Sequence, residues 1–282
     1  MALPSFAQHM RVLETSNIVL SQKAGRVRRF ALAPQALAGA ERWMLDQREI
    51  WEQRLDRMQD YVKGRQQGEA MSKVFANIAL SLDGYMTPEG MTIDHWDDPG
   101  FKNWGAKWGA LMSWLIGLEH FRSSLKIGPG GETGPVNDMV RHTSERIGAN
   151  IMGRRMFEAG ERSWPEEAPF HTPVFVLTHN TREPWVRPGG TTFHFVTDGP
   201  QSALAQAKAA AGGKDVRIAG GADVVQQYLK LGAVEELEIA LAPVLFGGGR
   251  RLFENLGDGL RSFQIDRVLH TPLATHLRYL PS

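Results

Sequence analysis

Three polar turns, each directly after a short apolar run, constrain the fold of this chain more than any other feature of its sequence. The runs are residues 149–152, 174–177 and 216–219; the turns that follow them are Gly153-Arg154-Arg155, Thr178-His179-Asn180 and Gly220-Gly221-Ala222-Asp223. Apolar runs of this length that stop at glycine or polar residues are typical of buried strands. In an open α/β sheet such strand ends share one edge, where anionic cofactors bind. The turns therefore predict a dinucleotide site.

Strand patterns alternate with helix patterns from Met71 onward, which predicts an α/β fold with a mostly parallel sheet flanked by helices. The expected strands are 73–81, 149–152, 174–177, 193–196, 216–219, 236–243 and 274–280, the last antiparallel. The expected helices are 141–148, 200–211 and 222–231.

The chain divides into a small head at 1–33, a long helix at 34–63, a polar linker at 64–70 and a large domain at 71–282. Apolar residues of the long helix recur at alternating spacings of three and four, a pattern that pairs with another helix. This spacing favours a homodimer held through 34–63. Packing of the same stripe against the large domain is the alternative.

Several classes of protein are excluded by what the sequence lacks. It contains no cysteine, so disulfides, thiolate zinc sites and a cysteine nucleophile are excluded, which suits a cytoplasmic protein. It has no apolar run near 18 residues, which argues against membrane insertion. Neither a His-Glu-x-x-His nor a Gly-x-Ser-x-Gly motif occurs, so a catalytic metal and serine acyl transfer have no support. We expect no metal.

Five motifs, in order along the large domain, carry a family resemblance. They are Ser-Leu-Asp-Gly at 81–84, Gly-Arg-Arg-Met-Phe-Glu at 153–158, Leu-Thr-His-Asn at 177–180, Ala-Gly-Gly-Ala at 219–222 and Ala-Pro-Val-Leu-Phe-Gly-Gly-Gly at 242–249. Together they resemble the dihydrofolate reductase fold, in the branch that contains the reductase domain of bifunctional riboflavin-biosynthesis enzymes. The resemblance covers about 71–282, apart from an insertion around 95–135.

The resemblance implies NADPH as the cofactor and assigns residues to it. A helix that starts at Gly220-Gly221 can place backbone amides against a pyrophosphate, and Arg154 or Arg155 can grip the adenosine 2′-phosphate. A surface pair between these arginines and Glu158 is the alternative. The residues expected at the cofactor are Ala79, Gly153, Arg154, Arg155, Thr178, His179, Asn180, Gly220, Gly221, Ala222 and Asp223.

Asp83 is the candidate catalytic residue, because it ends the first strand near the expected nicotinamide position and could orient substrate or relay a proton. An aspartate before glycine is equally typical of a simple turn. The glycine-rich segment 128–135 and Trp96, Trp104, Trp108 and Trp114 could form a lid or wall on the substrate side; ordinary packing is the alternative for the tryptophans.

The head at 1–33 reads as a helix, 4–14, followed by a basic hairpin of strands 18–21 and 27–32. It resembles the recognition helix and wing of ArsR-type winged helix-turn-helix regulators. That resemblance implies base contacts from Ser5, Gln8 and His9 and phosphate contacts from Lys23, Arg26 and Arg28. The bracing helices of that family do not precede this segment, so we expect DNA binding only if the winged helix is complete upstream.

Together with these patterns, the resemblance implies an NADPH-dependent reductase that transfers hydride to a C=N or C=O bond of a small heterocyclic substrate, pterin-like or ribosylaminopyrimidine-like. The alternative is an ArsR-like transcriptional regulator whose reductase-like domain senses a ligand without turnover. An assembly protein with a vestigial pocket is a third possibility.

Overall fold

The computed structural model describes residues 3–16, 18–25, 27–33, 44, 48, 72–91, 101–257 and 262–282. Its contacts separate the chain into two units, Met1–Gln67 and Gly68–Ser282, which are described one at a time. The helix and dimer contact expected at 34–63 and the linker expected at 64–70 lie outside the described residues, apart from Met44 and Arg48. Within the described ranges, no helix is both long and apolar enough to cross a membrane.

The first unit contains a helix and a hairpin, as predicted. The helix is α1 (Leu3–Thr15), and the strands are β1 (Val19–Ala24) and β2 (Val27–Leu32), which pair antiparallel from Val19–Leu32 to Ala24–Val27. Gly25 adopts φ +64° at the hairpin turn, a conformation that favours glycine.

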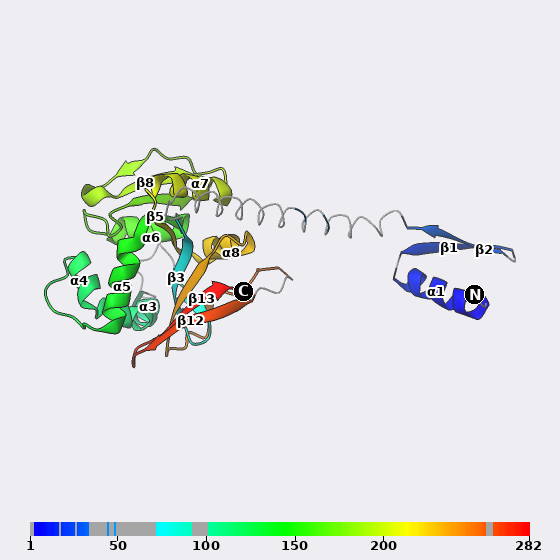
Figure 1. Cartoon of the computed structure of the whole chain (residues 1–282), viewed down its shortest axis with the longest axis horizontal. Coiled ribbons are helices and arrows are strands. Elements are labelled where there is room, and N and C mark those ends of the chain that lie inside the picture. Colours follow the sequence, from blue (N-terminus) through cyan, green and yellow to red (C-terminus); the bar gives the residue numbers. More distant parts are fainter. Residues whose placement is uncertain are drawn as a thin grey trace, which may run out of the picture. The chain divides into compact units, whose positions relative to one another are not determined.

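The second unit is an α/β domain (Figure 1). Its helices are α3 (Phe101–Ile116), α4 (Glu119–Ser124), α5 (Pro135–Arg146), α6 (Arg154–Ser163), the 3-10 helix η2 (Pro188–Gly190), α7 (Pro200–Ala210) and α8 (Ala222–Lys230). Its strands are β3 (Val74–Ser81), β4 (Tyr85–Pro88), β5 (Ile147–Gly153), β6 (Pro173–Leu177), β7 (Trp185–Val186), β8 (Thr192–Val196), β9 (Asp215–Gly220), β10 (Glu236–Ala242), β11 (Gly249–Arg251), β12 (Phe263–His270) and β13 (Thr275–Pro281).

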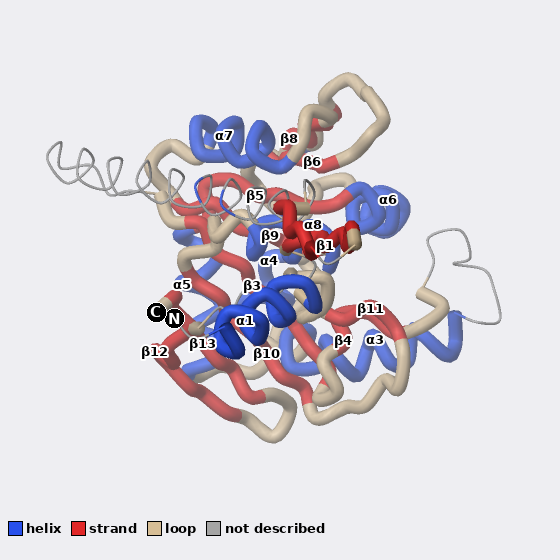
Figure 2. Tube along the Cα trace, turned by 90° about the vertical axis from the view of Figure 1, so that its right-hand side faces the viewer, coloured by secondary structure: helices blue, strands red, loops and turns tan. Residues whose placement is uncertain are grey.

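A nine-stranded sheet, ordered β12-β13-β10-β3-β9-β5-β6-β8-β7, organises this unit. Figure 2 shows its strands side by side from β12 to β8. Neighbouring strands from β10 to β8 are parallel, whereas β13, β12 and β7 join antiparallel. The predicted α/β fold with a mostly parallel, helix-flanked sheet is confirmed, as is the antiparallel last strand.

Helices cover both faces of the sheet, which explains why β3 reads as an almost continuous apolar run. Alternate residues of β3, such as Val74 and Ile78, pack with Val225 and Leu229 of α8 in the main core cluster. Residues between them face the opposite side, where Ala79 packs with side chains of α3 and α5.

Several elements differ from the sequence predictions. Helix α5 begins at Pro135 rather than 141, because proline in the first turn is compatible with a helix start, and β5 begins at Ile147. Strands β7 and β12 and the small sheet β4–β11 had not been predicted. Strand β12 is a sheet edge with a bulge between Ile265 and Arg267 and mostly exposed side chains, so its sequence lacks a clean apolar alternation.

The glycine-rich segment 128–135, expected as a lid or wall on the substrate side, contacts the start of α4. The Glu119 amide donates a backbone hydrogen bond to the Glu132 carbonyl, and the Glu132 amide donates one to the Gly117 carbonyl. A Cβ atom on Gly131 would lie 2.6 Å from the Glu119 nitrogen. Trp104 and Trp114 of α3 are buried, which supports ordinary packing, and Trp96 lies outside the described residues.

Candidate cofactor and substrate site

The structure brings the three predicted turns together at one edge of the sheet. Strand β5 lies between β9 and β6, with Met152 opposite Gly220 and Gly153 opposite Leu177. Because these strands are parallel, their carboxyl ends face the same side. The turns at 153–155, 178–180 and 220–223 therefore follow three adjacent strand ends.

Backbone conformation explains the two glycines at 220 and 221. Gly220 and Gly221 have φ values of +143° and +81°, which favour glycine, and a Cβ atom on Gly221 would make an ordinary contact with the Gly153 backbone at 3.7 Å. Gly221 is the N-cap of α8 and accepts hydrogen bonds from the Val224 and Val225 amides, while Gly153 is the N-cap of α6. Two helix N-termini thus start beside each other, and both favour anions.

The two consecutive arginines of α6 have different partners. Arg154 forms a 2.7 Å ion pair with Glu158 one turn along the helix, the alternative that the sequence left open. The Arg155 guanidinium instead lies 4.0 Å from the carboxylate of Asp223, in the first turn of α8. Arg155 is therefore the one of the two that faces the glycine turn.

Sequence reasoning missed Arg250, which approaches the same carboxylate. Its Nη1 lies 3.4 Å from Oδ2 of Asp223, and the main chain that carries it is held by the pairing of β11 with β4. The only available signal was the pair of arginines directly after the glycine run at 247–249. Asp223 is largely exposed between Arg155 and Arg250, so these two cations lie beside the helix start that the glycine turn forms.

The turn at 178–180 is polar and mostly exposed. Thr178 is buried, its amide donates to the Val196 carbonyl, and its hydroxyl accepts a 3.0 Å hydrogen bond from the Asn180 amide. His179 and Asn180 are exposed. Thr178 thus shapes the turn, and the two residues after it remain accessible at the strand end.

Asp83 joins the end of β3 to the loop that follows β10. Its carboxylate accepts hydrogen bonds from the Ser81 hydroxyl at 2.6 Å, the Phe246 amide at 3.1 Å and the Gly247 amide at 2.8 Å. Burial opposes its ionisation, but these hydrogen bonds outweigh burial and lower its pKa to about 2. At neutral pH the carboxylate is therefore ionised and accepts hydrogen bonds from the Ser81, Phe246 and Gly247 donors. These contacts suit a carboxylate that positions the loop rather than one that donates a proton.

Ala79 lies on β3 under the inserted helix α3. It packs against the cluster of Leu111, Ala242 and Phe246 and against that of Trp114 and Ala240. The Lys107 side chain donates to the Phe246 carbonyl at 2.9 Å, which ties α3 to the Asp83 loop. Helix α3 therefore forms a wall over the carboxyl-terminal halves of β3 and β10.

Tyr85 and Arg251 form a second polar pair near this loop, which the sequence did not indicate. The Arg251 guanidinium lies 4.5 Å from the centre of the Tyr85 ring and donates a 2.9 Å hydrogen bond to its hydroxyl. Leu82, Leu245 and Phe253 are exposed apolar residues of the same loops. This rim offers aromatic, apolar and cationic surface.

Among the described residues, no group of three His, Asp or Glu side chains is placed to hold a metal ion. In the first unit, Gln8, His9 and Lys23 are exposed, whereas Arg28 forms a 2.8 Å ion pair with Glu14. The Arg26 residue and the Ser5 side chain lie outside the described part.

Comparison with solved structures gives remote likenesses. A riboflavin biosynthesis protein from Shewanella sp. PV-4 is 22% identical, with 75% of this chain and 99% of that chain covered and a TM-score of 0.49. A diaminohydroxyphosphoribosylaminopyrimidine deaminase/5-amino-6-(5-phosphoribosylamino)uracil reductase from Thermotoga maritima is 11% identical, covering 79% and 59%, with a TM-score of 0.48. Dihydrofolate reductase from Enterococcus faecalis is 16% identical, covering 74% and 96%, with a TM-score of 0.40.

No curated protein matches the chain. The model of the RibD C-terminal domain family matches residues 72–272, which is most of the chain. None of these comparisons supports the ArsR-type segment expected at 1–33. The family model alone supports the reductase-domain resemblance of the large unit: this chain belongs to the RibD C-terminal domain family, a family of NADPH-dependent reductases.

Proposed function

We propose that this protein is an NADPH-dependent reductase that transfers hydride to a C=N or C=O bond of a pterin-like or ribosylaminopyrimidine-like heterocycle. One observation carries the proposal: three parallel strand ends meet where two helices begin, with Arg155 and Arg250 beside the glycine turn. Family membership supports the same reaction class.

The residues at this edge fit the anionic parts of NADPH. Gly220 and Gly221 lack the Cβ atoms that would block close approach, and the amides of Ala222 and Asp223 precede the first hydrogen-bonded turn of α8. We assign the pyrophosphate to this turn, with Arg155 and Arg250 as its cations. Arg154 then serves the 2′-phosphate, because its surface pair with Glu158 contributes only about 0.3–0.5 kcal/mol and is readily exchanged for a doubly charged phosphate.

When bound, NADPH supplies the hydride, and the chain supplies alignment and exclusion of water. Asp83 fixes the loop at 246–247, and α3 covers Ala79 and Ala240 so that a planar ring at the edge of this wall is shielded. The accompanying proton comes from solvent or from another group, because the low pKa of Asp83 keeps its carboxyl ionised.

Fluorescence titration with NADPH and NADH tests the cofactor assignment. We expect Arg154→Ala to weaken NADPH binding about tenfold and to leave NADH unchanged, because NADH has no 2′-phosphate. Arg155→Ala should weaken the binding of NADPH and of NADH about equally. Arg162→Ala, in the last turn of the same helix, is the matched control and should alter neither.

Equal affinity of the wild type for NADPH and NADH would refute the 2′-phosphate assignment. Turnover is measured separately, by the loss of NADPH absorbance with dihydrofolate and with a ribosylaminopyrimidine analogue. NADPH binding without turnover of either substrate would favour the ligand sensor over the reductase.

The helix and hairpin of the first unit support a second candidate function, binding of DNA. Gln8 and His9 are exposed on α1 and Lys23 on β1, as the resemblance required, although Arg28 is paired with Glu14. A gel shift with duplex DNA at moderate salt tests this candidate, with Gln8→Ala/His9→Ala as the variant. Absence of a shift for the wild type, or an equal shift for the variant, would remove it.

A further inference from the structure

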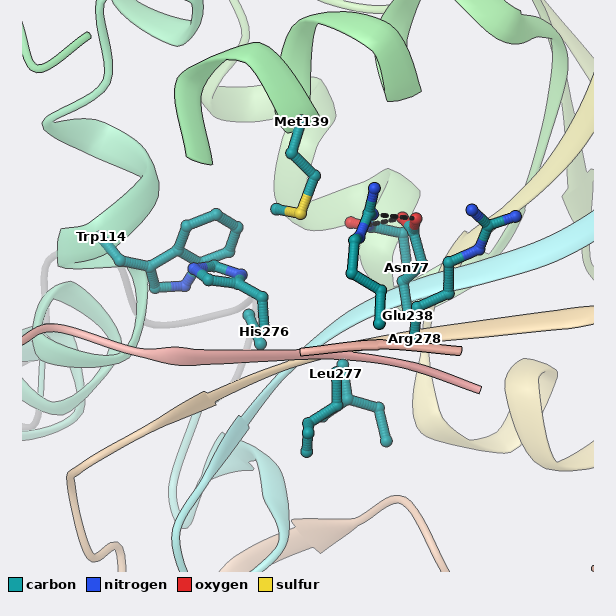
Figure 3. Close-up of a pocket in the computed structure, with 10 residues that line it drawn as sticks. Asn77, Trp114, Met139, Glu238, His276, Leu277 and Arg278 are labelled. Carbon is teal, nitrogen blue, oxygen red and sulfur yellow. Dashed lines mark hydrogen bonds and ion pairs between the residues drawn. The ribbon is translucent and has the colours of Figure 1, made fainter. Parts of the chain in front are cut away.

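A small cavity with both polar and apolar lining residues lies between the sheet and the helices α3 and α5. Figure 3 shows its lining: Trp114 of α3 and Met139 of α5 on one side, and Asn77, Glu238 and His276 rising from β3, β10 and β13. Leu277 of β13 points to the opposite face of the sheet. The space open to the centre of a water-sized sphere is about 10 Å³.

Two side chains in this cavity have polar atoms without hydrogen-bond partners. They are Nε1 of Trp114 and Nε2 of His276, and their residues are only 7% and 5% exposed. The two rings meet edge to face, with centroids 4.6 Å apart. Arg278 Nε also lacks a hydrogen bond, but it lies 3.4 Å from a carboxylate oxygen of Asp266. Trp114 and His276 are therefore the unsatisfied pair.

An unsatisfied buried donor is costly, and native proteins rarely leave one without a partner. The indole N–H can only donate, so whatever satisfies it must accept a hydrogen bond. The space in the cavity, about 10 Å³, is at the lower limit of what holds one water molecule. A single water is therefore an occupant that fits this space and can accept the indole hydrogen bond.

The surrounding charges exclude an ion. Three arginines face this region, and they are already matched by carboxylates: Arg146 by Asp215 and Glu236, Arg267 by Glu238, and Arg278 by Glu236 and Asp266. No cation remains in surplus to hold an anion. Burial and the nearby Arg267 lower the pKa of His276 to about 4, so its ring is neutral. The N–H of Trp114 equally disfavours a cation.

We propose that this cavity binds one water molecule, which accepts a hydrogen bond from Trp114 Nε1 and donates one to His276 Nε2. The water then serves as the polar anchor of α3, the inserted helix, on β13. This binding fixes the proton of the His276 ring on Nδ1. The proposal does not depend on the reductase assignment, although it fixes the helix that forms the wall of that site.

Replacement of a single atom tests the proposal. Site-specific incorporation of 3-benzothienylalanine at Trp114 exchanges the indole N–H for sulfur and keeps the shape of the ring. If the water is present, the variant loses a hydrogen bond, and its unfolding equilibrium constant should rise about fivefold. If the cavity is dry, the exchange removes an unsatisfied donor, so the variant should be equally or more stable than the wild type, which would overturn the proposal.

Two further measurements complete the test. The same exchange at Trp185, whose indole nitrogen is not among the buried unpartnered atoms, is the matched control and should change the constant less than twofold. In the wild type, NMR should show a rotating-frame cross-peak between the Trp114 indole proton and water. Absence of that cross-peak would contradict the proposal independently of stability.

Discussion

Glu236 offers a sharp test of how this domain is stabilised. Its side chain has no solvent exposure, and its carboxylate lies between two guanidinium groups, those of Arg146 and Arg278, the latter at 2.6 Å. Both arginines are about a quarter exposed, at 26% each. The substitution Glu236→Gln keeps the shape of the side chain, removes its charge and replaces one acceptor oxygen by an N–H donor.

The expected cost follows from what the substitution leaves behind. Removal of one partner of a buried ion pair typically costs about 3–5 kcal/mol, because the remaining charges stay desolvated. Here Arg146 keeps Asp215 at 2.8 Å, and Arg278 keeps Asp266 at 3.4 Å. We therefore expect the lower end of that range, about 3 kcal/mol. Arg278→Met should cost less, about 1–2 kcal/mol, because Arg146 still neutralises the buried carboxylate.

Urea unfolding of the full chain, followed by circular dichroism, measures both costs. The midpoint should fall in each variant while the slope stays constant. Glu161→Gln is the matched control, since Glu161 pairs with Arg182 at 2.7 Å on the surface, and its cost should stay below about 1 kcal/mol. If Glu236→Gln cost no more than this control, or less than Arg278→Met, the assignment of a buried, doubly paired anion would be refuted.

Three further predictions concern pH and backbone geometry. The pKa of His276 is 6.5 in the unfolded chain but about 4 in the folded protein. Its contribution to the free energy of unfolding is therefore full above pH 6.5 and is lost as the pH falls toward 4. His276→Gln should therefore remove about 1–2 kcal/mol of the stability that the wild type loses between pH 7 and 5, as measured by urea unfolding at both pH values. Asp83→Asn should lower the free energy of unfolding by about 1.5–3 kcal/mol. Because the pKa of Asp83 is lowered to about 2, the difference in stability between wild type and variant should persist down to about pH 4. A difference that vanishes above pH 5 would contradict this pKa. Gly249→Ala would place the Cβ atom 1.9 Å from the Thr87 carbonyl oxygen and should lower the free energy of unfolding by more than about 2 kcal/mol. Gly90→Ala, where the added Cβ meets open space, is the control and should cost about 1 kcal/mol. Equal losses of the two variants in thermal melts would contradict this contact.

The sequence predicted the parts of the site that depend on local patterns. The strand ends before Gly153 and Gly220 could be found because apolar runs stop there and helices start. The spacing of Arg154 and Glu158, one helical turn apart, also revealed their pairing as an alternative. In contrast, Arg250 reaches Asp223 only through the β4–β11 pairing, which no local pattern announces.

The same limit applies to the buried charges. Arg146 and Glu236 are 90 positions apart in the sequence, and they meet because β5 and β10 bring the ends of distant segments to one side of the sheet. Trp114 and His276 likewise come from an inserted helix and the last strand. Each residue, read alone, is an ordinary charged or aromatic residue, so the contact could not be inferred before the topology was known.

The position of these charges separates stability from ligand binding along a single strand. Strand β9 begins at Asp215, which pairs with Arg146, and ends at Gly220, in the predicted pyrophosphate turn. At about 3.3 Å per residue, the two ends are roughly 16 Å apart, too far for a direct contact between these charges and the turn. Glu236→Gln should therefore lower the unfolding free energy and leave the NADPH dissociation constant of the folded protein within about twofold. A parallel loss of affinity, measured well below the unfolding midpoint, would mean that the two edges are mechanically coupled through the sheet.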